Sequence, residues 1–130
     1  MASALYPKAV EQAAATLIGS TVTPAGTLSV CVVDTGTYTY SAAHEFESDL
    51  SGVVGSPVAL STVTNTLGVI DADNPEFLGL NGDSIEAVVI FLDTGTPATS
   101  RLIAYLDGLT YTPNGADLTL TVDAQGLFKL

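Results

Sequence analysis

The feature that most constrains this chain is a two-residue alternation in its apolar runs, which dominates from residue 20 onward. Apolar and small side chains alternate through residues 27–32, and the pattern returns in residues 118–123. Successive side chains of a strand point to opposite faces, so this period is typical of β-strands. Turn-forming Gly, Pro and Asn residues separate the runs. The sequence therefore predicts a mostly β domain, built as an antiparallel sandwich or barrel.

One run, Ile85–Leu92, is apolar almost throughout. A strand that is covered on both faces gives such a run, so we expect it at the centre of a sheet. Its expected neighbour is Leu102–Leu106. Further strands are expected at Pro57–Thr64 and, closing the sheet, at Phe128–Leu130. A short inserted helix is expected at Ala42–Leu50.

The first 19 residues predict a helix. Pro7 suits a first helical turn, and Gly19 is a plausible stop. An apolar stripe lies on one face, and it comprises Val10, Ala13, Ala14, Leu17 and Ile18. The stripe needs cover from the chain's own sheet or from a neighbouring subunit. We expect one domain of 130 residues, with the helix at 1–19 and the β-sandwich at 20–130.

Charge is scarce and one-sided. Charged residues make up 13% of the chain and apolar residues 47%, and this charged share is about half of what soluble domains carry. Such a surface is expected to contact protein, which favours an oligomer. The chain has 14 acidic residues and only three basic ones, which are Lys8, Arg101 and Lys129. They form no basic patch, which argues against nucleic-acid and anionic-membrane partners. With no long apolar run and no signal peptide, synthesis is expected in the cytoplasm.

A short motif, Asp-Thr-Gly-Thr, occurs twice after an apolar run, at Asp34 and at Asp93. One interpretation is a pair of similar turns, in which the aspartate caps the turn and glycine supplies a positive φ. The other is an acid protease, in which two adjacent aspartates share one proton. The spacing of the two motifs favours the turns, since two-lobed proteases need far more chain between their aspartates.

Other catalytic and cofactor patterns are weak. His44 is the only histidine and is expected on a helix surface, and Cys31 is the only cysteine and is expected in the core. The oxygen-rich segment 71–76 could bind calcium, but it lacks the spacing and the glycine of an EF-hand loop, so a turn is the favoured interpretation. We therefore expect no catalytic residues, no metal and no cofactor, and a protein that is not an enzyme.

Several strings of the sequence resemble a family of small virion structural proteins of tailed bacteriophages. They span nearly the whole chain and comprise Leu5–Lys8, Val32–Phe46, Ser48–Leu50, Gly82–Ile90, Asp93–Thr96, Thr99–Tyr105, Thr112–Gly115 and Phe128–Leu130. The chain departs from the family at Thr121–Gly126, where the family tends towards a tryptophan and a longer Asn/Gly turn. This departure concerns the conformation of the last hairpin.

The resemblance implies a virion component, made in the host bacterium and located in the virion. The sequence suits a capsid decoration or cement protein that stabilises the lattice of the major capsid protein, arranged by analogy as a trimer. The alternative is a tail, connector or fibre-base component. We expect the helix to seat on the capsid, and the two motif turns to lie near each other and near an interface. The candidate interface residues are Val10, Leu17, Ile18, Asp34, Tyr38, Tyr40, Asp93 and Arg101.

Overall fold

The apolar run of residues 85–92 lies at the centre of the main sheet. In the computed structural model, which describes residues 4–19 and 25–129, this run forms the middle strand of an open, five-stranded antiparallel sheet. The sheet order is β1 (Ala4–Leu5), β8 (Arg101–Tyr111), β7 (Ile85–Asp93), β2 (Thr27–Val33) and β3 (Val53–Ala59). The predicted central strand and its predicted neighbour are thus confirmed. In the described part of the chain, β1 and β3 are the two edge strands and do not pair with each other, so the sheet is open and does not close into a barrel.

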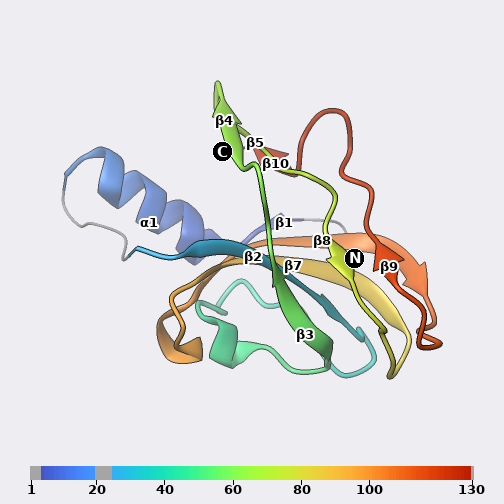
Figure 1. The fold of residues 1–130 in the computed structure, drawn as a ribbon. Helices are drawn as coiled ribbons and strands as arrows, with labels where there is room; N and C mark the ends of the chain where they lie inside the picture. Colours follow the sequence, from blue (N-terminus) through green and yellow to red (C-terminus); the bar gives the residue numbers. More distant parts are fainter. Residues whose placement is uncertain (1–3, 20–24, 130) are drawn as a thin grey trace.

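Short strands form a second layer over one face of the main sheet (Figure 1). One group has three strands in the order β10 (Phe128–Lys129), β5 (Val69–Asp71) and β4 (Thr64–Thr66). The other pairs β6 (Glu76–Phe77) with β9 (Leu118–Thr119). All of these pairings are antiparallel.

The opposite face is covered by the segment after β2 and by the start of helix α1 (Pro7–Leu17). Two 3-10 turns, η1 (Glu47–Asp49) and η2 (Pro97–Thr99), lie close together beyond one end of the sheet. The main sheet is therefore buried on both sides. Val30 and Val32 belong to the core on one face, and Cys31 and Val33 to the core on the other. Burial on both faces explains why residues 30–33 of β2 and 87–92 of β7 are all apolar.

A bulge adapts the edge strand β3 to its neighbour. The pairing of β2 with β3 shifts between Val30 and Val32, opposite the segment that holds Gly55 and Pro57. Gly55 has a φ of 71°, and a Cβ there would come within 2.7 Å of Leu80. Glycine is thus required at this bend, and the edge position accommodates a proline that could not donate to a central ladder.

Several predicted boundaries are wrong. The strand expected at Pro57–Thr64 begins and ends earlier, as β3, because the bulge admits Pro57 into the strand interior. The helix expected at Ala42–Leu50 shrinks to η1. Here the Asp49 carboxylate accepts hydrogen bonds from the N–H groups of Glu45 and Phe46, at 2.8 and 3.0 Å, and closes a local turn.

The chain ends differ from the prediction as well. Phe128 pairs with Ile70 in the second layer and does not close the main sheet. Only Leu118–Thr119 of the predicted strand at 118–123 pairs. At the other end, Ala4 and Leu5 pair with β8 as an edge strand, so the helix begins only at Pro7 and not at the first residues. Residues 1–3, 20–24 and 130 of the predicted elements lie outside the described residues.

Candidate protein-binding surface

Helix α1 turns its more apolar side outward. It packs on β8 through Ala9, which is 8% exposed, while Val10, Leu17 and Ile18 are 45%, 87% and 77% exposed. Ala14 is also exposed. We call Val10, Ala14, Leu17 and Ile18 the outer stripe. The predicted stripe is thus real, except that Ala13 is partly buried, and the chain's own sheet does not cover it.

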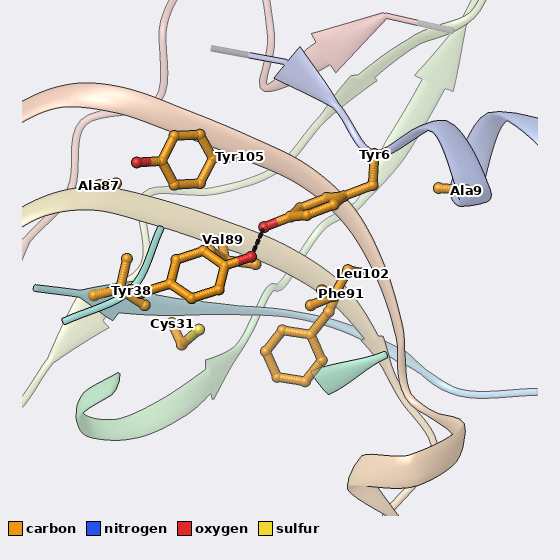
Figure 2. Close-up of a cluster of buried hydrophobic side chains, with 10 residues drawn as sticks. Tyr6, Ala9, Cys31, Tyr38, Ala87, Val89, Phe91, Leu102 and Tyr105 are labelled. Atoms are coloured by element: carbon orange, nitrogen blue, oxygen red, sulfur yellow. Dashed lines mark hydrogen bonds between the residues drawn. The ribbon is translucent and has the colours of Figure 1, made fainter. Parts of the chain in front are cut away.

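The orientation of α1 is fixed at its first residues. Tyr6 precedes the helix as its N-cap, is fully buried, and donates its N–H to the carbonyl of Ile103 at 2.9 Å. Its hydroxyl lies 2.7 Å from that of Tyr38 (Figure 2). The Tyr38 hydroxyl in turn lies 2.8 Å from Nδ1 of His44. This chain of contacts ties the helix start to the core, and the helical periodicity then places Val10 and Leu17 on the outside.

The tyrosine cluster is part of the core. Tyr38 is 1% exposed, and its ring lies 6.2 Å from that of Tyr105 and 5.4 Å from that of His44. Burial, more than any other cause, raises the pKa of Tyr38 to about 12. The half-buried Tyr40 packs between Tyr6 and Tyr105. The sequence predicts Tyr38 at an interface, but its hydroxyl is satisfied inside the subunit and its ring offers no surface to a partner.

An apolar groove of about 260 Å³ lies beside the helix. It separates α1 from the second layer, and Ala13 lines it next to the outer stripe. Its other walls come from the main sheet and the second layer, and include Leu28, Leu92, Ile103, Val63, Ile70 and Phe128. The groove therefore extends the apolar surface of the helix toward β10.

The charges around this surface are paired. Lys8 Nζ lies 3.7 Å from a Glu11 carboxylate oxygen, and Arg101 donates to Glu45 at 2.9 Å. The Arg101 guanidinium also lies 4.9 Å from the centre of the Phe46 ring. Arg101 lines the groove but is already engaged within the subunit. Helix α1 thus carries no net charge of its own, and the positive charge of Arg101 in the groove is neutralised within the subunit.

Asp34 and Asp93 lie at opposite ends of the strand pair β2–β7. Thr27 is opposite Asp93, whereas Val33, just before Asp34, is opposite Ala87. Seven residues of strand separate the two positions, which is roughly 20 Å. The expectation that these turns lie near each other is wrong, because antiparallel pairing places the end of β2 and the end of β7 at opposite ends of the sheet. They cannot form the dyad of the acid-protease hypothesis.

Each of the two aspartates caps its own turn. Asp34 Oδ1 accepts the N–H of Gly36 at 2.9 Å, and Asp93 Oδ1 accepts the N–H of Gly95 at 2.8 Å. These contacts confirm that each aspartate caps its turn. The glycine part of the interpretation holds only for Gly95, which has a φ of 90°, since Gly36 does not have a positive φ.

A second cavity, which the sequence pattern did not indicate, lies at the far end of β8 and has a volume of about 500 Å³. Glu86 and Asp107 contribute carboxylates to it, and Tyr105 contributes its ring. The Glu86 carboxylate accepts the N–H and the hydroxyl of Thr35, both at 2.9 Å. The backbone bond from Thr35 is the main cause that lowers the pKa of Glu86. The carboxylate thus fixes the turn after β2.

The other singled-out groups have structural partners. Cys31 is buried, and burial, aided by Glu47, raises its pKa to about 12. His44, expected on a helix surface, sits partly buried in an irregular segment with its ring on Tyr38. Asp73, in the irregular segment after β5, accepts the hydroxyl of Thr62 at 2.7 Å, so its carboxylate joins this segment to the one before β4. Among residues 4–19 and 25–129, no cluster of three or more His, Cys, Asp or Glu side chains could hold a metal ion.

Comparison with known proteins finds no protein-family model and no curated protein that matches the sequence. In the described part of the chain, no helix has the length and apolar character that crossing a membrane requires.

Proposed function

We propose that this chain is a structural subunit of a tailed-phage virion, most specifically a capsid decoration or cement protein that binds the lattice of the major capsid protein. The observation that carries the proposal is the outer stripe of α1. A helix that buries Ala9 and exposes Val10, Leu17 and Ile18 leaves apolar area in water unless another protein covers it. A protein that functions by contact needs such area.

Two further observations support the proposal. The resemblance of the sequence to small virion proteins spans most of the chain. The candidate groups for chemistry, namely Asp34, Asp93, Cys31 and His44, are each engaged in turns or in the core. A cement protein acts by bridging neighbouring subunits, and this needs complementary surfaces more than reactive groups.

The proposal is tested by mixing the purified chain with undecorated capsid shells of the phage that encodes it. We expect the chain to sediment with the shells and to saturate at a fixed number of copies per capsid protein. Heat resistance of the shells should increase, because a ligand that binds only the assembled lattice stabilises it.

Isolated tails and connectors of the same phage serve as the parallel arm. Binding to tails or connectors alone would move the proposal to the tail, connector or fibre-base alternative. Failure to bind shells, tails and connectors would overturn the virion proposal altogether.

A further inference from the structure

We infer that the outer stripe of α1 is covered by a second copy of this chain, so that the protein self-associates through its N-terminal helix. This inference names the partner of the surface on which the proposed function rests. It is argued from the distribution of charge along the chain, from the spacing of the stripe, and from where the other exposed apolar residues lie.

The charge of the chain is confined to one part of it. Residues 1–33 contain one basic residue, Lys8, and one acidic residue, Glu11, and are neutral overall. The remaining residues carry 13 acidic and two basic side chains, which accounts for the whole net charge of −11. Two copies repel each other wherever their acidic surfaces approach. They can meet at the least electrostatic cost through α1.

The immediate surroundings of α1 support this argument. Lys8 is paired with Glu11 on the helix, and Arg101 is paired with Glu45 beside it. A strongly basic partner would be drawn to the acidic remainder of the molecule and not to this neutral face. The partner that fits the stripe is itself neutral and apolar there, as a second α1 is.

The spacing of the stripe suits helix-to-helix packing. Val10, Ala14 and Leu17 are four and three residues apart, which is the spacing of the seam between two packed helices. The small side chain of Ala14 lies midway and lets two helix axes approach closely. Ile18 widens the seam at the end of the helix, where it is 77% exposed.

The two most exposed apolar side chains outside the stripe lie on turns. Leu67 and Leu78, which are 93% and 72% exposed, belong to the turns that follow β4 and β6. Single exposed leucines are ordinary on a protein surface, whereas a helix that carries four apolar positions on one side is not. Leu78 therefore provides a matched control for Leu17.

The inference is tested by sedimentation equilibrium of the isolated chain. We expect the wild-type protein to sediment as a multiple of its 13.3 kDa mass. The dissociation constant of the oligomer should be at least tenfold higher for the Leu17→Lys variant than for the wild type. The Leu78→Lys variant should have the dissociation constant of the wild type. Added salt should tighten the association, since it screens the repulsion between acidic copies. Urea unfolding of each variant at a concentration where it is monomeric establishes that the fold is intact.

The result that overturns the inference is a wild-type chain that stays monomeric up to its solubility limit. If that chain still binds capsid shells, and Leu17→Lys abolishes the binding while Leu78→Lys does not, the stripe seats on the capsid. The proposed function then stands and the self-association fails. A chain that associates through α1 but binds no virion component gives the reverse result.

Discussion

At the scale of single residues, three polar rings decide how the N-terminal helix is held. Each hydroxyl proton in this chain of contacts finds an acceptor when Tyr6 donates to Tyr38 and Tyr38 donates to Nδ1 of His44. Burial is the main cause that raises the pKa of the Tyr6 hydroxyl, followed by its hydrogen bond to Tyr38. Both tyrosines therefore remain protonated donors. Tyr38, which lies between the other two, provides the hydrogen-bond partner of both Tyr6 and His44.

The Tyr38→Phe variant should lose about 1–3 kcal/mol of unfolding free energy, because it leaves the buried Tyr6 hydroxyl without its partner. The double variant Tyr6→Phe/Tyr38→Phe should lose less than the sum of the two single losses, since the phenylalanines leave no orphaned hydroxyl. Urea denaturation measures all four proteins. Strict additivity would show that the two hydroxyls are not coupled.

Asp49 predicts how stability depends on acid. Hydrogen bonds from the N–H groups of Glu45 and Phe46 lower its pKa in the folded state. A lowered pKa gives stability that is full above the unfolded-state pKa, about 4, and is lost as the pH falls toward the folded value. The Asp49→Asn variant should be less stable than the wild type at pH 7, and the difference should shrink in acid. Urea midpoints across this range measure it, and a difference independent of pH would contradict the assignment.

At the scale of elements, the strands with local signals could be predicted and those without them could not. The apolar run of β7 and the alternation in β2 arise from burial of these strands on the main sheet, so the sequence carries them directly. The short strands of the second layer exist only through pairing with distant segments, as Phe128 does with Ile70. A strand of two or three residues is too short to show a periodicity from which such a pairing could be predicted.

The candidate surface was predictable only in part. The stripe on α1 follows from helical spacing, but its outward orientation depends on Tyr6, whose partner Tyr38 lies 32 residues away. The placement of Asp34 and Asp93 also depends on topology. Two similar turns at the ends of adjacent strands are neighbours if the strands are parallel and distant if they are antiparallel, and the motif itself does not distinguish the two cases.

Two glycines test how the turns fit against the sheet. Gly52 and Gly95 have φ values of 63° and 90°, but a Cβ on Gly52 would lie 2.9 Å from the Asp34 carbonyl oxygen, while one on Gly95 meets nothing within 4 Å. Gly95→Ala should cost about 1–2 kcal/mol from backbone strain alone. Gly52→Ala should cost roughly 1–3 kcal/mol more through the clash. Equal losses in thermal or urea unfolding would contradict this packing.

At the scale of the whole molecule, a neutral apolar helix is joined to a strongly acidic β body. The acidic body keeps copies apart except at α1, which makes the contact selective. Such a division suits a subunit that must remain soluble when free and still pack against others. The claim on which this account depends is that a second copy of the chain covers the outer stripe.

Thiol labelling of the Ala14→Cys variant tests that claim most directly. The native Cys31 is 1% exposed and has a pKa of about 12, so it stays silent in the folded protein. We predict that the thiol introduced by Ala14→Cys reacts slowly in concentrated solution and faster on dilution, while the matched variant Ala124→Cys, on an exposed turn, reacts rapidly throughout. If Ala14→Cys reacts as fast as Ala124→Cys at every concentration, the stripe is open to water and the account is contradicted.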